Sequence, residues 1–447
     1  MRNPLVRAAC AALFVVLSAS GTSVVFADDG FTPDANMSRS DIPELYKWDL
    51  SPVFPSDAEW EKAVWEVMTG SEKLKAFQGK LDDPVCLSKA LAVYFDLHVL
   101  ANKVTLYSNL LHDVDQVAPE NQARLNKGLQ TMDSLMSAAA FLRKEIMLMD
   151  DEAVKQAYAI VPDLVTCRSY IEGLRRRRWI LLSDESERIL SLAGDNLFAE
   201  IDLNEIPAAP EKAFTGILSD IPWPEITDEQ GTKVRLSLSS YGRYRASSKR
   251  SVRAEAVDAL FKTLKQYRHA LAATLAGQVE FNSFLARSRG YSSAMEAYLD
   301  KDDLTPAVVV NLVDAINANL RPLHKYMALR KKVMNVDSLR LYDLYVPMVE
   351  GVEKEVPYKE AHEMILEALK PLGPEYMSVL KEGMDLANGW VDLFPCMNKD
   401  SGAFSASVYG CHPYVKMNYF NTLDDASTLA HEFGHALHTY FSMKNQP

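Results

Sequence analysis

Apolar side chains recur every three to four residues along most of the chain after residue 56. In the segment 88–114 they include Leu91, Tyr94 and Leu97. This spacing places them on one face of an α-helix, whereas a half-buried strand would need strict alternation. The same period appears in further segments, 119–149, 186–193, 251–288 and 306–333. The sequence therefore predicts a mainly α protein, with a helical N-terminal region over residues 28–210 and a second region over residues 211–447.

Two segments lack the helical period and are typical of short strands. Residues 213–240 carry Gly231 between two alternating apolar runs, which favours a small hairpin. Residues 402–420 are rich in aromatic and β-branched side chains, interrupted by Gly410 and Pro413. We expect a small β element in each segment.

The N-terminus has the pattern of an export signal. Two arginines precede a short apolar run, residues 8–20, and Val25 and Ala27 are the small residues that a signal peptidase accepts. An uncleaved membrane anchor is the alternative, but the run falls short of the about 20 apolar residues that a bilayer span needs. We therefore expect residues 1–27 to be removed and the protein to be periplasmic or secreted.

The net charge of −12 bears on possible partners. Nucleic acids bind to basic surfaces, so we expect no nucleic-acid partner. The one basic run, residues 175–178, precedes acidic residues 184–187, and we interpret it as a solvated helix end. No segment after the signal has the length and apolar character of a membrane span, so we expect no stable membrane insertion.

The cysteines outside the signal are few and widely spaced. Cys86, Cys167, Cys396 and Cys411 include no CxxC pair, which excludes a Cys-rich zinc module. Export would permit a disulfide between Cys396 and Cys411, and four separate thiols are the alternative.

The sequence HEFGH at residues 431–435 has the spacing of a zinc-binding helix. His431 and His435 would lie one helical turn apart on the same face, so both imidazoles could bind one tetrahedral zinc ion. Glu432 could take a proton from a metal-bound water and pass it to a leaving amine. A chance match on a surface helix is the alternative, but the motif has apolar neighbours, as a buried metal helix would. We expect one Zn²⁺ per chain.

The surrounding residues predict that the motif is helical. Asn421 or Thr422 could cap the helix, and Asp424 and Asp425 would then lie in its first turn, where the helix dipole favours acids. Gly434 is unfavourable in a helix interior, and its small size could let another backbone approach.

A catalytic zinc ion needs a third protein ligand, commonly a carboxylate for this motif. His438 lies nearly one turn beyond His435, and we interpret it as a packing residue or as a partner of a ligand. It stands where the metzincin pattern has glycine, and Phe441 stands where that pattern has a third histidine, which excludes that class. Because no Asp or Glu follows His435, we expect the third ligand from upstream or from outside this chain.

The chain resembles the oligoendopeptidase F branch of the thimet-oligopeptidase-like zinc metallopeptidases. The resemblance rests on residues 421–441, which look like that family's zinc helix, and on HPYVKMNY at residues 412–419. Three further segments match in kind and order: SGAFS (401–405), LRLYDLYVP (339–347) and RGYSS (289–293). The resemblance covers residues 45–447.

The resemblance implies a zincin-type helical fold whose two halves flank a deep substrate channel. It also implies a zinc-dependent endopeptidase that cleaves short unstructured peptides, with His431 and His435 as zinc ligands and Glu432 as general base. In the family the third ligand is a glutamate on a following helix. That residue would fall beyond Pro447, so we expect residues 211–447 to be a catalytic domain that is incomplete at its C-terminus.

Three consequences are expected of such a chain. Its zinc binding and activity should be weak, and Phe433, Leu437 and Phe441 should form an exposed apolar patch that lacks its cover. A non-catalytic protein that binds peptides in the channel is the alternative function.

The segment before the motif is a candidate substrate site. In zincins an edge strand at this position pairs with the peptide backbone. We therefore expect main-chain groups at Gly402 and Ala403, with the polar edges of His412 and Tyr414, to line the channel. Packing beneath the helix is the alternative for this segment, and we prefer it for the aromatic residues that follow Asn418.

Overall fold

The computed structural model describes residues 31–192, 209–348 and 355–445. The proposed signal, residues 1–27, lies outside this part. Helices dominate the described chain and two small sheets accompany them, which confirms the mainly α prediction.

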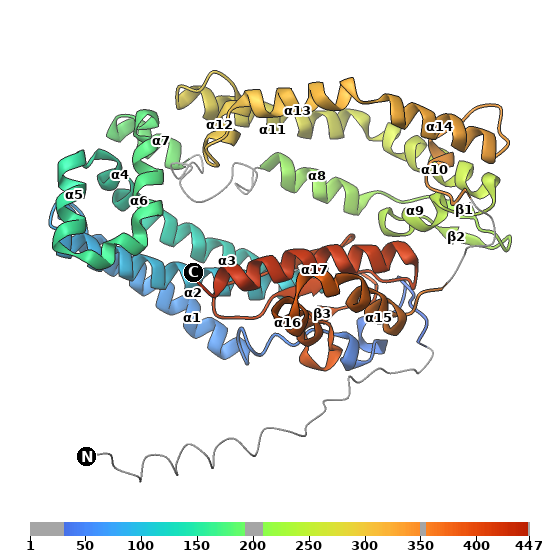
Figure 1. The fold of residues 1–447 in the computed structure, drawn as a ribbon, viewed down its shortest axis with the longest axis horizontal. Coiled ribbons are helices and arrows are strands. Elements are labelled where there is room, and N and C mark those ends of the chain that lie inside the picture. Colours follow the sequence, from blue (N-terminus) through green and yellow to red (C-terminus); the bar gives the residue numbers. More distant parts are fainter. Residues whose placement is uncertain (1–30, 193–208, 349–354, 446–447) are drawn as a thin grey trace, which may run out of the picture.

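Figure 1 shows two layers of helices that are joined at one end. The joining end and part of the lower layer come from the first seven helices. These are α1 (Asp57–Leu74), α2 (Pro84–Val114), α3 (Pro119–Ala138), α4 (Ala140–Leu148), α5 (Asp151–Ile160), α6 (Arg168–Arg176) and α7 (Asp184–Leu192).

The upper layer comes from the middle of the chain. Its elements are α8 (Ala209–Asp220), β1 (Glu225–Thr227), β2 (Lys233–Arg235), α9 (Leu238–Arg245), α10 (Arg250–Gln266), α11 (Arg268–Ser288), α12 (Ala294–Asp300), α13 (Pro306–Ala318) and α14 (Arg321–Val333). Strands β1 and β2 form an antiparallel hairpin. The predicted hairpin is therefore present over residues 225–235, but residues 213–220 belong to helix α8 instead.

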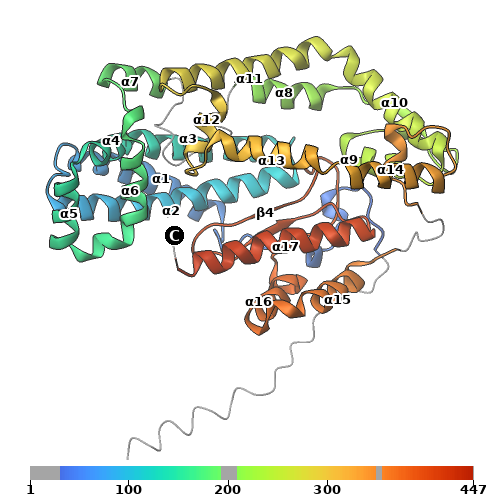
Figure 2. The ribbon, with the colours of Figure 1, turned by 45° about the horizontal axis from the view of Figure 1, so that its top comes forward.

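The chain returns to the lower layer for its last elements, as Figure 2 shows from a second side. They are α15 (Tyr358–Leu369), α16 (Pro374–Met384), β3 (Val391–Asp392), β4 (Phe404–Ala406), β5 (Tyr414–Lys416) and α17 (Leu423–Met443). The strands form one sheet in the order β3-β5-β4, with β5 parallel to β3 and antiparallel to β4. The prediction of a small β element before the motif is confirmed.

Two of the long helical periods in the sequence, 119–149 and 251–288, are each divided into two helices. Ala139 separates α3 from α4 with φ −86° and ψ −2°, and Tyr267 separates α10 from α11 with φ −97° and ψ 7°. A residue with ψ near 0° lies outside the α-helical region, so one helix ends there and the next begins in a new direction. Neither position is Gly or Pro, so no local signal in the sequence marks these bends.

Helix α2 corrects the expectation that no segment after the signal resembles a membrane span. Among the described residues it alone has the length and composition of one. It lies against α1 and α3, and its Leu91, Tyr94 and Val104 are buried in the hydrophobic core. A core helix of a globular protein has the same composition.

Two core clusters bring the beginning of the chain to its end. One contains Ile42 and Tyr46 together with buried residues of α15, α16 and α17. The other contains Trp48 and buried residues of α1 and α2 together with Val408 and Tyr414. The three-stranded sheet lies between these clusters, because Val415 belongs to the first cluster and its neighbour Tyr414 to the second.

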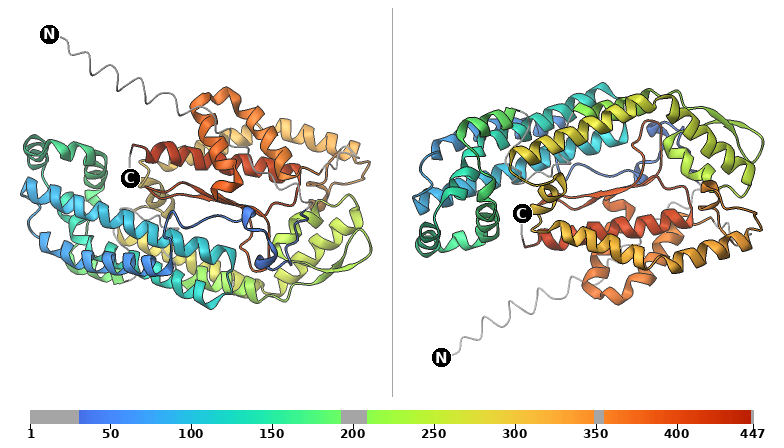
Figure 3. Two further views of the ribbon diagram at one scale, coloured as in Figure 1. Left: turned by 90° about the horizontal axis from the view of Figure 1, so that it is seen from below. Right: turned by 90° about the horizontal axis from the view of Figure 1, so that it is seen from above.

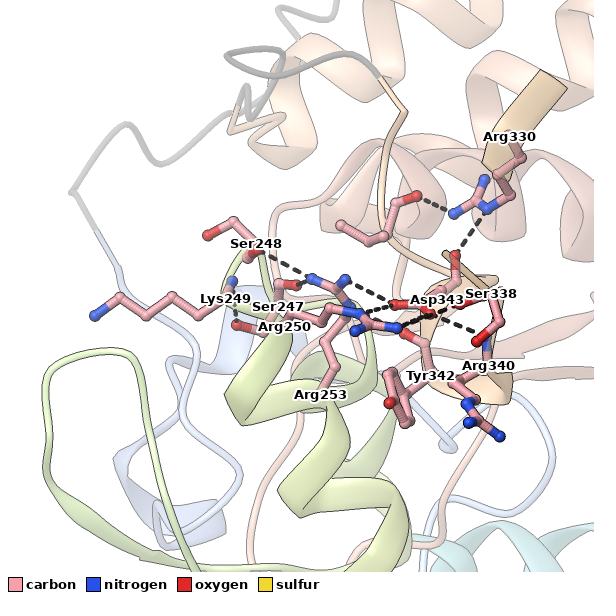
Figure 4. A network of polar contacts seen from close by, with 11 residues as sticks. Ser247, Ser248, Lys249, Arg250, Arg253, Arg330, Ser338, Arg340, Tyr342 and Asp343 are labelled. Atoms are coloured by element: carbon pink, nitrogen blue, oxygen red, sulfur yellow. Dashed lines mark hydrogen bonds and ion pairs between the residues drawn. The ribbon is translucent and has the colours of Figure 1, made fainter. Parts of the chain in front are cut away.

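A buried carboxylate joins α10 to the segment that follows α14. Asp343 is fully buried, and its Oδ1 accepts hydrogen bonds from Arg250 Nε at 3.0 Å and Arg253 Nη2 at 3.1 Å. Arg330 of α14 donates to the main-chain oxygen of Asp343 at 2.7 Å (Figure 4). These arginines attach α10 and α14 to the same turn of chain.

The structure also answers the question of the disulfide. Cys86, Cys167, Cys396 and Cys411 are all free thiols, and Cys396 is buried. Of the two possibilities left open by the sequence, the structure has the separate thiols.

Candidate metal centre

Helix α17 begins where the sequence indicates. Thr422 is its N-cap: its side chain accepts a hydrogen bond from Asp425 N at 3.1 Å, while the Asp425 carboxylate accepts one from Thr422 N at 2.9 Å. This reciprocal pair is a capping box, and it satisfies backbone donors that a helix start leaves free. Asp424 and Asp425 lie in the first turn, as predicted. The capping box therefore fixes the start of the helix at Leu423, eight residues before His431.

The apolar face of α17 is covered, which corrects the expectation of an exposed patch. Phe433 and Leu437 are fully buried, and Phe441 packs partly buried against the same core cluster. Helix α16 approaches closely: a Cβ added at Gly383 would lie 2.9 Å from Phe433 Cε1. The prediction failed because elements upstream in the sequence, α15, α16 and the sheet, supply the cover.

The two motif histidines meet on the opposite, exposed face of α17. Their Nε2 atoms are 3.1 Å apart and their ring planes are inclined by 80°. Two nitrogens that bind one tetrahedral zinc ion at about 2.0–2.1 Å are about 3.3 Å apart. The arrangement of His431 and His435 therefore fits a shared metal ion within a few tenths of an ångström.

Glu432 lies between the histidines in sequence and is buried, with 7% of its surface exposed. A carboxylate is rarely buried without a charged or hydrogen-bonding partner, and a metal ion or a bound water would be one. Within residues 31–192, 209–348 and 355–445, no group of three His, Cys, Asp or Glu side chains is placed to hold a metal ion. The described side chains thus offer two imidazoles to a metal ion.

His438 and Gly434 are two further exposed residues of α17 near the motif. His438 is exposed one turn beyond His435 and is not brought into a metal-binding group. At Gly434 the structure corrects our expectation of a close backbone: among the described residues, and apart from the adjacent residues and the backbone of α17 itself, no heavy atom lies within 4 Å of an added Cβ. The exposed side of Gly434 faces open space, so the glycine leaves the region beside the two imidazoles unobstructed.

Strand β4 places an open sheet edge beside the helix. Among the described residues β4 has a neighbouring strand on one side only, in the sheet order β3-β5-β4, and it contacts α17. The Ser407 and Thr439 hydroxyls are 2.8 Å apart and connect the end of β4 to the turn after His435. No pattern in the sequence indicated this contact, since its partners are 32 residues apart.

The chain bends directly before β4. Gly402 is exposed with φ +81°, a conformation that favours glycine, and its oxygen accepts a hydrogen bond from Asn418 Nδ2 at 2.8 Å. Ala403 is half-buried against the core below α17. Both residues directly precede the edge strand β4, in the segment that the sequence predicts to bind a peptide.

Tyr414 begins β5, the central strand of the sheet, and His412 lies two residues before it. Tyr414 is fully buried and packs edge-on against Trp48, with ring centroids 6.1 Å apart. Its prediction as a channel-lining residue is not met, because the alternation along β5 directs it toward α1 and α2. The His412 ring stacks on Trp390 at 4.9 Å, and burial lowers its pKa, so it is neutral at pH 7.

A mainly helical fold that carries an HExxH helix beside the edge of a small sheet defines a class, the helical metallopeptidases. Comparison with known proteins refines this assignment. The sequence model of Peptidase family M3 matches residues 243–447. The oligopeptidase PepF of Bacillus subtilis is 34% identical over 411 residues, which are 92% of this chain and 60% of that protein.

Solved structures agree. The structure of a putative peptidase from Chlamydophila abortus superposes with a TM-score of 0.67 at 30% identity, over 92% of this chain and 68% of that one. The oligoendopeptidase-F of Enterococcus faecium superposes with a TM-score of 0.62 at 30% identity, over 73% of this chain and 60% of that one. The chain belongs to the oligoendopeptidase F family within peptidase family M3. It spans 60–68% of the length of these three proteins.

Proposed function

We propose that the chain carries the metal-binding part of a zinc-dependent endopeptidase for short unstructured peptides. The observation that supports this proposal most directly is that the Nε2 atoms of His431 and His435 are 3.1 Å apart, with the buried Glu432 between these residues in the sequence. Family M3 is zinc-dependent, and the Bacillus relative is named an oligopeptidase. We assign one zinc ion to His431 and His435.

When bound there, zinc would supply a Lewis acid for the hydrolysis of a peptide bond. Glu432 is the general base in this proposal: its carboxylate accepts a proton from the attacking water and delivers it to the leaving nitrogen. The water oxygen then bonds to the carbonyl carbon as the carbon–nitrogen bond breaks. Burial of Glu432 suits this role because it excludes water, so that the proton passes to the bound peptide and not to solvent.

We propose that the peptide binds along strand β4. A sheet edge has unpaired main-chain donors and acceptors, and an extended peptide can add to them as another strand. The contact between β4 and α17 would hold such a peptide near the two histidines. Gly402 and Ala403 continue the edge and are the first residues we assign to this site, while the deep channel implied by the family stays a prediction.

The zinc site is tested by metal content. We expect the full chain to bind one zinc ion, measured by competition with a chromogenic chelator, and His431→Ala and His435→Ala to lower the affinity by tenfold or more. His438→Ala is the matched control, a third exposed histidine on the same helix, and should leave the affinity unchanged. Equal losses in all three variants would contradict the assignment.

The reaction is tested with a quenched fluorescent peptide. We expect cleavage to stop in the presence of a chelator and to fall by at least a hundredfold in Glu432→Gln, since one general base contributes about 10²–10⁴-fold. Cleavage that resists the chelator, or full activity of Glu432→Gln, would refute the proposal. Peptide binding by calorimetry without cleavage in the zinc-saturated chain would favour the alternative, a peptide-binding protein.

We further propose that the protein is exported, on the pattern of residues 1–27. Expression in a bacterium with a periplasm, followed by N-terminal sequencing, should give a mature chain that begins after Ala27. A chain that keeps its first residues and stays in the cytoplasm would contradict this.

A further inference from the structure

Arg245 of α9 packs against two tyrosine rings. Its Cζ atom lies 3.7 Å from the ring centroid of Tyr345, in the segment after α14, and 5.4 Å from that of Tyr241, one turn earlier on α9. A guanidinium that stacks on an aromatic ring keeps the N–H groups at its edge in a fixed fork that matches a carboxylate. Arg245 is half-buried and Tyr345 is 49% exposed, so a ligand can reach this fork.

The sequence around Arg245 is basic. Residues 231–254 include seven cations and no acid, although the whole chain has a net charge of −12. Arg250 and Arg253 of this segment are paired with Asp343. Within the described part of the chain Arg245 forms no ion pair, and the side chains stacked on it are uncharged. The positive charge of Arg245 can therefore attract an anionic ligand.

The acids near α9 gather around a different residue, Tyr244. Asp228 and Glu229 interact electrostatically with Tyr244, and Arg243 lies over the Tyr244 ring at 5.7 Å. At 100° per residue, Arg243 and Arg245 point in nearly opposite directions from the helix axis. Arg243 is therefore the arginine on the acidic side of α9, and it provides a matched control for Arg245.

Helix α9 lies at the end of the molecule where α17 begins, as Figures 1 and 3 show. It also approaches the lower layer, because Tyr244 interacts electrostatically with Asp34. Phe31 and Met37, on either side of Asp34 in the sequence, pack against the core cluster that contains the buried residues of α17. The Arg245 site is therefore displaced from the two motif histidines toward the start of α17.

The sheet indicates the direction of a peptide bound to β4. Strand β4 runs antiparallel to β5. The last turns of α17 lie where β5 begins, because the ring centroids of Tyr440 and Trp390 are 6.0 Å apart and Trp390 stacks at 4.9 Å on His412. Six residues connect the end of β5 to the start of α17, so α17 runs opposite to β5 and in the direction of β4. A peptide that pairs antiparallel with β4, the more stable arrangement, would extend its C-terminal part toward the start of α17.

We propose that Arg245, with Tyr241 and Tyr345, binds a carboxylate in the C-terminal part of a peptide. The carboxylate belongs to the last residue or to an acidic side chain near it, since both present the same pair of oxygens to the guanidinium fork. This site depends on the proposed function, peptide binding along β4, and adds a preference for peptides that carry such a carboxylate. It does not depend on the zinc ion, because Arg245 belongs to the upper layer.

Calorimetry with the full chain tests the site. The probe is an N-acetylated peptide of uncharged residues in three forms, with a free C-terminal carboxylate, with a C-terminal amide, and with an amidated glutamate as its last residue. A chelator is present, so that no cleavage accompanies binding. We expect a carboxylate form to bind about tenfold more tightly than the plain amide, because a charge-assisted pair with Arg245 is worth that much.

The two carboxylate forms identify the source of the ligand. Tight binding of the free acid alone assigns the site to the terminal carboxylate. Tight binding of the glutamate form alone assigns it to an acidic side chain, and tight binding of both assigns it to either. Each of these results supports the proposal, and in each the preference should shrink at high salt, where charges are screened.

Three variants examine the role of Arg245 itself. Arg245→Gln should lower the affinity for the carboxylate forms to that of the plain amide and leave the affinity for the amide unchanged. Arg245→Lys should restore part of the preference, since lysine keeps the charge and lacks the planar fork. Arg243→Gln removes the same charge from the opposite side of α9 and should leave all three affinities unchanged. Circular dichroism should show the same helix content in every variant.

Two results would overturn the carboxylate site and leave the proposed function intact. One is equal affinity of the original chain for all three forms. The other is a loss in Arg245→Gln that is as large for the amide as for the carboxylate forms, which would assign Arg245 a structural role. Binding of none of the forms would overturn both the site and peptide binding along β4. A preference that depends on Arg245, in a chain that does not cleave the quenched peptide, would contradict the peptidase activity alone.

Discussion

Replacing Asp343 with Asn should destabilise the protein because it removes one buried negative charge. Asp343 Oδ2 accepts hydrogen bonds from Arg250 Nη2 at 2.8 Å and Arg340 N at 2.9 Å, in addition to the two bonds at Oδ1 (Figure 4). The substitution keeps the shape of the side chain and removes its charge. One carboxylate oxygen becomes an amide donor that faces other donors, and the buried Arg253 loses its counter-charge.

The expected size follows from the pKa of this carboxyl. The hydrogen bonds from Arg250 lower the pKa of Asp343 from 3.8 to about 2. One pKa unit corresponds to about 1.4 kcal/mol, so the carboxylate form is stabilised in the folded protein by about 2 kcal/mol. The Arg250 side chain is 46% exposed, which screens part of this interaction, while the misplaced amide donor adds a cost. We therefore expect Asp343→Asn to lower the free energy of unfolding by about 2–4 kcal/mol at pH 7.

The pH dependence gives the sharper test. A folded-state pKa below the unfolded value stabilises the protein above pH 4, and this stabilisation is lost as the pH falls through 2. With pKa values of 3.8 and about 2, about half of it remains at pH 3. The difference between the original protein and Asp343→Asn should therefore shrink by about 1 kcal/mol between pH 7 and pH 3.

Urea unfolding followed by circular dichroism at pH 7, 5 and 3 measures this difference. Asp82→Asn is the control, because Asp82 is exposed and should change the stability by less than about 0.5 kcal/mol. A loss below 0.5 kcal/mol at pH 7, or a loss that is as large at pH 3 as at pH 7, would refute the argument.

Three further substitutions test how α17 and its sheet are packed. Phe433→Ala should cost about 3–5 kcal/mol in urea unfolding because the side chain is fully buried, and a cost below 1 kcal/mol would mean that this face is exposed after all. Thr422→Ala should cost about 1 kcal/mol by removing the capping box, whereas Thr428→Ala, outside the cap, should cost less. Tyr414→Phe should change stability by less than about 1 kcal/mol, because its buried hydroxyl has no hydrogen-bond partner in the described structure, and it should leave peptide binding unchanged. A specific loss of peptide binding in Tyr414→Phe would restore its assignment to the substrate site.

The features that the sequence predicted correctly are those with a local cause. Residues four apart on any α-helix share a face, so the spacing of His431 and His435 brought their imidazoles together without reference to the rest of the fold. The N-cap at Thr422 follows equally from its own side chain and from Asp425, three residues on. The apolar period predicted a mainly helical protein for the same reason, since it depends on the geometry of a single helix.

Which side chains are buried, and on which side of the sheet they lie, depended on segments far away in the sequence, and only the tertiary structure decided it. The cover over Phe433 comes from α16 and Trp390, and the side on which Tyr414 lies is set by the pairing of β5 with β3 and β4. The two arginine side chains that bind the Asp343 carboxylate, Arg250 and Arg253, are 93 and 90 residues before it.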